Sequence, residues 1–135
     1  MRILLISFVL LSYKPLFSQY RLYDLLITEF MADPTPVVSL PNAEFVEVYN
    51  NTNDTISLLN WQLADAATAA LIRTNYRLPP NEYVILCGTN NVSSFSVYGP
   101  TIGITGFPNL NNDEDKILLI DPAGKTIHEI HYTLQ

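Results

Sequence analysis

Short alternations of apolar and polar residues run along the chain and predict β-strands rather than helices. Residues 45–49 show the pattern most plainly, because Val46 and Val48 face one side and the residues around them face the other. This period of two is typical of a half-buried strand. No long stretch of period 3.6 occurs, so the pattern predicts an all-β domain.

An earlier strand places Leu25, Ile27 and Met31 on one side. It is expected to end at residues 32–36, where two prolines prevent the backbone from continuing a ladder of hydrogen bonds. A loop then leads to the strand at residues 44–50.

The middle of the chain changes its hydrophobic phase. Residues 56–58 continue as strand, and the alternation of Leu59, Trp61 and Leu63 that follows is out of step with them. A bulge or tight corner at Leu58–Leu59 explains such a shift. After the small residues 64–70, a short strand is expected at 71–73, although an Ala-rich run also suits a helical turn.

Three segments follow with contrasting character. Residues 77–81 are expected to form a turn, and residues 82–87 are apolar at nearly every position, which predicts a central strand covered on both faces. Residues 88–114 hold four glycines, two prolines and an Asn/Asp-rich end. They predict a long loop with at most one short pairing segment, and loops of this length are often functional.

The chain ends with the pattern of a hairpin. Strands are expected at 116–120 and 126–132, joined by the turn 121–124, which has Pro second and Gly fourth. Strands at this spacing without intervening helices predict a β-sandwich.

The N-terminal residues have the layout of a secretory signal peptide. Arg2 precedes an uncharged apolar stretch that ends at Lys14-Pro15, shorter than the stretch of about 20 apolar residues that spans a bilayer, so the layout favours a signal peptide over the alternative of a membrane anchor. Small Ser18 marks the expected cleavage point. Residues 1–18 are therefore predicted to be a signal peptide and residues 19–135 the exported domain, which has no membrane span once the signal is removed and is secreted or held at the cell surface.

Composition and charge narrow the possible functions. The single cysteine excludes a disulfide scaffold, and Cys87, at the end of an apolar run, is expected to be a small buried residue. The net charge is −6, and removing Arg2 and Lys14 leaves five basic and thirteen acidic residues, or −8. Without a basic stripe, we expect no nucleic-acid binding.

An acidic cluster at the end of the long loop is a candidate cation site. Asn111, Asp113 and Asp115 provide oxygen ligands at alternate positions, as a hard cation such as calcium requires. The spacing is not that of an EF-hand, and a solvated turn before the next strand explains the cluster equally. We expect no obligatory cofactor, and calcium is the candidate ligand.

Other polar residues do not predict catalysis. On a strand, His128 falls opposite His131, and only Glu129 and His131 share a face, which gives two ligands where catalytic zinc needs three. Glu29, Glu44 and Glu47 are likewise not expected to converge. We therefore expect no catalytic residues and no enzyme activity.

Three aromatic residues stand in the long loop among Gly and Ser: Phe95, Tyr98 and Phe107. Aromatic anchors on a loop are common binding elements, but they also serve to cover an open end of a sandwich. Trp61, between two leucines, is expected in the core.

Several segments together resemble the lamin tail domain, in the form found in exported bacterial proteins. They are Leu26–Pro34, Glu44–Asn50, Asn60–Leu63, Pro80–Leu86, Asp113–Ile120 and Asp121–Lys125. The likeness covers about residues 24–132. It implies an immunoglobulin-like β-sandwich used for attachment or interaction.

The resemblance sets the functional hypothesis. We expect a non-catalytic secreted or cell-surface module that binds protein or glycan through Phe95, Tyr98 and Phe107. The alternative is a calcium-binding or metal-dependent accessory domain of an extracellular hydrolase. The sequence does not predict an oligomeric state.

Overall fold

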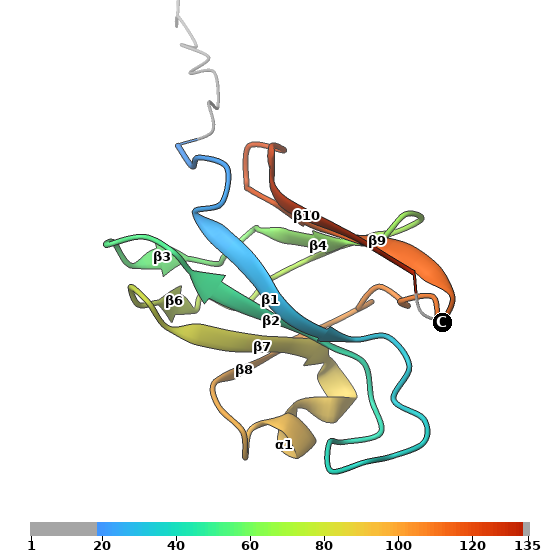
Figure 1. Ribbon diagram of the computed structural model, residues 1–135. Coiled ribbons are helices and arrows are strands. Elements are labelled where there is room, and N and C mark those ends of the chain that lie inside the picture. Colours follow the sequence, from blue (N-terminus) through green and yellow to red (C-terminus); the bar gives the residue numbers. More distant parts are fainter. Residues whose placement is uncertain (1–18, 134–135) are drawn as a thin grey trace, which may run out of the picture.

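Two four-stranded β-sheets pack face to face in the computed structural model, which describes residues 19–133 (Figure 1). One sheet has the order β1-β2-β7-β8 and the other the order β10-β9-β4-β5, while β3 and β6 form a small separate pair. The strands are β1 (Leu25–Met31), β2 (Phe45–Asn50), β3 (Ile56–Ser57), β4 (Gln62–Ala64), β5 (Ala69–Leu71), β6 (Arg77–Leu78), β7 (Tyr83–Gly88), β8 (Thr101–Ile104), β9 (Glu114–Ile120) and β10 (Thr126–Thr133). The all-β sandwich is confirmed, whereas the signal peptide lies outside the described residues.

The main core lies between the sheets and contains the inward residues of both. Val46 and Val48 of β2 are fully buried there, as the alternation predicted. Trp61 has no exposed surface and packs against the ring of Tyr20, with centroids 4.8 Å apart. The prediction that Trp61 belongs to the core is confirmed.

A bulge in β1 overturns the prediction for Met31. The pairing of β1 with β2 shifts between Ile27 and Glu29, and such an extra residue moves the following side chains to the opposite face. Phe30 therefore packs on the main core, and Met31 joins a second cluster on the outer side of the sheet.

The predicted corner after β3 is a tight turn at Leu59–Asn60. Asn60 has φ +66°, and the Trp61 N–H donates to the Leu58 carbonyl at 3.2 Å. Asn tolerates this left-handed conformation better than most residues. The short strand expected at 71–73 lies slightly earlier, as β5.

Residues 88–114 contain more regular secondary structure than the long loop that was predicted. After β7, the chain forms a 3₁₀ turn η1 (Thr89–Asn91) and the one-turn helix α1 (Val92–Phe95), then pairs in parallel with β7 as β8. A helix this short has no hydrophobic period, so the residue pattern does not predict it. Gly103 is needed in β8, because a Cβ there would lie 3.0 Å from Thr89 Cα.

The segment 77–81 is also only partly a turn. Arg77 and Leu78 pair with β3 as β6, and the turn follows at Pro80–Asn81. The prediction for β7 is confirmed, because it lies inside its sheet and α1 covers part of its outer face.

Candidate functional site

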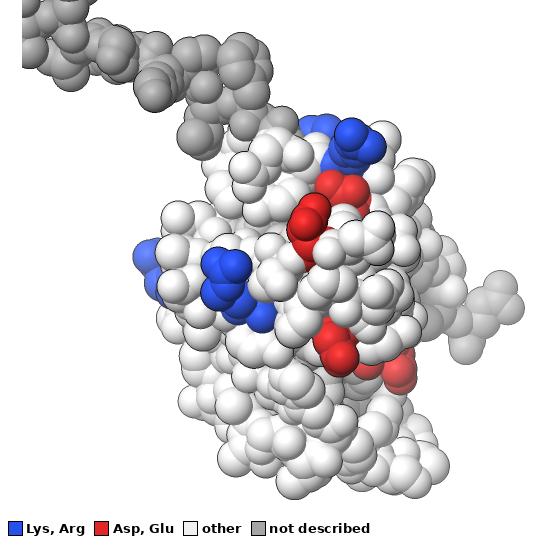
Figure 2. Space-filling view, turned by 90° about the vertical axis from the view of Figure 1, so that its left-hand side faces the viewer, with Lys and Arg blue, Asp and Glu red and all other residues white. Residues whose placement is uncertain are grey.

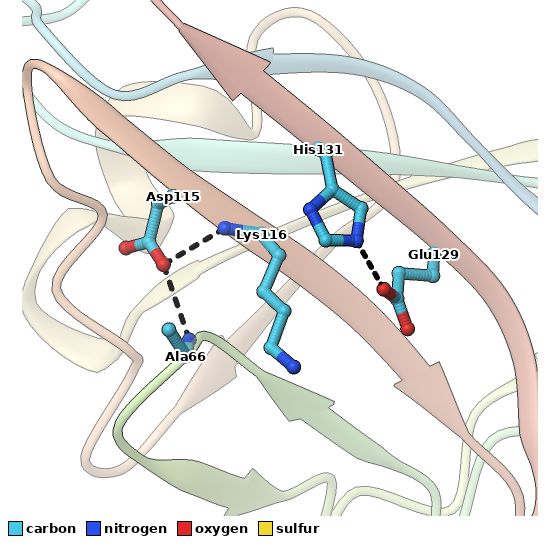
Figure 3. A network of polar contacts seen from close by, with 5 residues as sticks. All are labelled: Ala66, Asp115, Lys116, Glu129 and His131. Carbon is cyan, nitrogen blue, oxygen red and sulfur yellow. Dashed lines mark hydrogen bonds and ion pairs between the residues drawn. The ribbon is translucent and has the colours of Figure 1, made fainter.

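The acidic loop is built around Asp115 at the start of β9. Its Oδ1 accepts the backbone N–H groups of Lys116 at 2.8 Å and Ala66 at 3.1 Å (Figure 3), and its Oδ2 accepts that of Asn111 at 3.1 Å. Burial opposes ionisation, but these three donors outweigh it and lower the pKa of Asp115. The carboxylate therefore ties the loop to the β4–β5 hairpin.

This arrangement gives the calcium prediction no geometric support. Asn111 and Asp113 are exposed, while both oxygens of Asp115 are engaged by backbone donors. Within residues 19–133, no three His, Cys, Asp or Glu side chains come together in a group suited to a metal ion. Calcium binding stays a prediction.

The two histidines of β10 lie on opposite faces, as the strand pattern predicted. His131 forms an ion pair with Glu129 on the outer face (Figure 3). His128 points the other way, and its Nδ1 accepts the backbone N–H of Ile27 at 2.8 Å. Burial lowers the pKa of His128, which favours the neutral ring that this hydrogen bond requires.

Glu44, Glu47 and Glu29 do not form one cluster, again as expected. Glu47 faces outward and accepts the Thr28 hydroxyl at 2.8 Å, and Glu29 is its cross-strand partner on β1, so these two of the three are neighbours. Glu44 lies elsewhere, where burial and the charge of Asp65 raise its pKa despite a hydrogen bond from the backbone of Leu110.

Tyr132 was missed at the sequence level, although it holds the acidic loop. Its hydroxyl donates to the Asn111 carbonyl at 2.8 Å. Burial and the negative charges of Asp115, Glu44 and Asp65 raise the pKa of Tyr132 to about 12. The phenol therefore stays protonated and acts as a hydrogen-bond donor.

The three loop aromatics have different environments. Phe95 is only 1% exposed and packs against Phe45 with ring centroids 5.2 Å apart, so of the two roles that the sequence left open the structure favours packing over surface binding. It anchors α1 in the second cluster, with Ile85 and Cys87. Phe107 is half-buried against the main core.

Tyr98 is the aromatic residue of the three that remains largely exposed. Its hydroxyl donates to the Ser39 carbonyl at 3.0 Å. This hydrogen bond joins the segment after α1 to the loop between β1 and β2. The sequence left open whether Tyr98 is an exposed anchor or a ring that folds back, and it did not indicate this contact with a residue far away in the chain.

Those two segments, residues 34–43 and 89–100, form a charge-free end of the molecule. Neither contains Lys, Arg, Asp or Glu. On the face drawn in Figure 2, charged side chains gather over the upper and middle parts, and the lower end, where α1 lies in Figure 1, carries none. Exposed apolar residues stand on it: Val37, Val38, Val97 and Tyr98, with exposed fractions of 55%, 74%, 77% and 54%.

The valines were missed, although the sequence contained a signal. From Tyr83 to Asn112 no charged residue occurs, which is unusual for a stretch that holds exposed turns. That gap in the charge pattern marks the same end of the domain.

Comparison with known families identifies the fold. The model of the lamin tail domain matches residues 19–133, nearly the whole chain. The chain belongs to the lamin tail domain family. The resemblance seen in the sequence is therefore confirmed, and this lamin tail domain is an immunoglobulin-like β-sandwich.

No curated protein matches this lamin tail domain. None of the helices within residues 19–133 has the length and apolar character needed to cross a bilayer.

Proposed function

We propose that this lamin tail domain is a non-catalytic interaction module that works outside the cell and binds a protein through its charge-free end. The observation that carries the proposal is the exposure of Val37, Val38, Val97 and Tyr98 on a surface without charged residues. The acidic charges of the chain lie elsewhere.

Desolvation explains why this end suits binding. Removing a charged group from water is costly unless it is paired, whereas valine and tyrosine gain from burial. The cores of protein interfaces are accordingly poor in charge and rich in aromatic residues. Aliphatic side chains such as Val38 and Val97 favour a protein partner, because a glycan offers little apolar surface to them.

The charge-free end is also held in place before binding. Phe95 anchors α1 against Phe45, and the hydrogen bond from Tyr98 to Ser39 joins the two segments. Such preorganisation reduces the conformational entropy lost on binding.

A non-catalytic role agrees with the state of the nucleophile candidate. Cys87 has no exposed surface, and burial raises the pKa of its thiol to about 11. A reactive cysteine needs a lowered pKa and access to solvent. The thiol is therefore a packing group.

The test is binding of the labelled full chain to the surface of intact source cells. The double variant Val38→Ser/Val97→Ser should bind at least tenfold more weakly, while the matched variant Leu22→Ser/Leu71→Ser, which removes two exposed leucines outside the charge-free end, should bind as the parent does. Both should keep the parent melting temperature.

Three outcomes would contradict the proposal. Equal binding by both double variants places the interface elsewhere. Loss of cell binding after glycosidase treatment, but not after protease treatment, makes the partner a glycan. Retention of the protein in the cytoplasm would refute the extracellular part.

A further inference from the structure

A groove of about 270 Å³ lies on the outer face of the first sheet, beside the charge-free end. Its lining includes Glu47 of β2, Tyr83 and Ile85 of β7, and Tyr98 and Pro100 before β8. Tyr98 holds its place through the hydrogen bond to Ser39. We call this feature the tyrosine groove.

The groove carries negative charge without a positive counterpart. Glu47 and Glu82 line it, and no Lys, Arg or His does. Within residues 19–133, neither carboxylate forms a salt bridge. The hydrogen bond from Thr28 to Glu47 Oε1, 2.8 Å long, fixes that carboxylate on the outer face.

Exposed aromatic rings are the second feature of the tyrosine groove, besides its carboxylates. Tyr83 is 46% exposed, and its ring lies against that of Tyr49 with centroids 4.6 Å apart and planes tilted by 40°. Tyr98 adds a second exposed ring to the same groove. The face of an aromatic ring carries negative potential and attracts a cation within about 6 Å of its centroid.

We propose that the tyrosine groove binds an organic cation, namely an alkylammonium or guanidinium group. Two carboxylates and two tyrosine rings attract such a group by charge and by cation–π contact, and they repel anions. The net charge of −8 of residues 19–135 favours the approach of a basic ligand. This site is distinct from the exposed valines of the protein contact proposed above, although Tyr98, Gly99 and Pro100 of its lining belong to the charge-free end.

The test is an NMR titration of the isotope-labelled chain with two probes, choline and N-acetyl-arginine amide. Glucose and sodium chloride at matched ionic strength serve as controls. We expect saturable shifts of the backbone amides of residues 82–85 and 98–99 with the organic cations alone. Tighter binding of the arginine probe indicates a basic protein side chain as the natural ligand, and tighter binding of choline indicates a quaternary ammonium headgroup.

Shape-preserving variants test the charges. Glu47→Gln/Glu82→Gln should weaken cation binding at least about fivefold. Glu114→Gln/Glu129→Gln removes the same charge from exposed positions on the other sheet and should change binding less than twofold. Tyr83→Leu should weaken binding in the same way as the first pair.

Three results would overturn the proposal: shifts that sodium chloride reproduces, binding that survives Glu47→Gln/Glu82→Gln, or saturation by glucose but not by choline or the arginine probe. The variant Val38→Ser/Val97→Ser should bind the cations normally. Refuting the cation site therefore does not refute the proposed protein contact, and refuting the protein contact does not refute the cation site.

Discussion

Asn50, the last residue of β2, is expected to be the polar side chain on which the fold depends most. It has no exposed surface, and its Nδ2 donates to the carbonyls of Asp54, Leu78 and Pro79 at 2.8, 3.0 and 3.0 Å. Its Oδ1 accepts the backbone N–H and the hydroxyl of Thr52 at 3.0 and 2.8 Å. One amide thus joins the end of β2 to the next turn, to the last residue of β6 and to Pro79 after it.

The cost of Asn50→Ala follows from these contacts. A buried polar group left without a partner costs about 1–3 kcal/mol. The contact with Leu78 is fully buried, whereas those with Asp54 and Pro79 are partly buried, where water replaces some of the loss. We expect a decrease of about 3–5 kcal/mol in the free energy of unfolding, out of about 5–15 kcal/mol for an ordinary domain.

Asn50→Asp keeps the shape but replaces the donating amide with an oxygen. The carboxylate then faces three carbonyl oxygens, so the folded state raises the pKa of the new group. Its protonated form donates a hydrogen bond again. The destabilisation relative to the parent should therefore be largest near neutral pH and should shrink as the pH falls through that raised pKa.

The assay is urea unfolding followed by the fluorescence of Trp61, the single tryptophan of the chain. Asn53→Ala, an exposed position in the same turn, is the control and should change stability by less than about 0.5 kcal/mol. A cost below about 1 kcal/mol for Asn50→Ala would refute the reasoning. So would an Asn50→Asp deficit that is the same at acid and neutral pH.

Three further predictions rest on single contacts. Gly103→Ala should lower the free energy of unfolding by about 1–3 kcal/mol in the same assay, because its Cβ would lie 2.7 Å from Val92 Cγ2 and 3.0 Å from Thr89 Cα. The control Gly99→Ala has open space around the new Cβ and should lower it much less. Equal losses in the two variants would refute the packing argument. Burial lowers the pKa of His128 from its usual 6.5, so its neutral form contributes stability that is fully present above about pH 6.5 and is lost as the pH falls through the lowered pKa. The melting temperature should therefore fall less on acidification in His128→Leu than in the parent, and parallel curves of melting temperature against pH would contradict this. The buried Cys87 thiol, with its pKa raised to about 11, should react with a thiol reagent at pH 8 only as fast as the protein opens, and rapid labelling without urea would show that it is accessible.

The sequence predicted the strands whose alternation is local. Val46 and Val48 face the main core because period two alone decides their side. Met31 was assigned to the wrong face, because the bulge before Glu29 depends on pairing with β2 rather than on the residues of β1. The same dependence on a pairing partner explains why β6 was predicted as a turn and why the position of β8, the one short pairing segment allowed in residues 88–114, was not predicted.

The candidate site was predictable only in part. Phe95 and Tyr98 have similar sequence surroundings, yet one is buried and the other exposed. The difference depends on Phe45, far away in the chain, whose ring packs against that of Phe95. The tyrosine groove brings β2, β7 and the segment before β8 together, so the register of the sheet had to be known before it could be recognised.

The seam between β1 and β10 has a mechanical consequence. The Tyr23 N–H donates to the Ile127 carbonyl and the Ile27 N–H to His128 Nδ1, and the rings of Phe30 and Tyr132 pack at a tilt further along. The two strands therefore run in the same direction. Tension applied through the two ends of the domain slides one strand along the other and loads these contacts together, in shear. An antiparallel seam would instead be peeled apart one contact at a time. For the interaction module proposed above, this geometry gives resistance to pulling through its two ends.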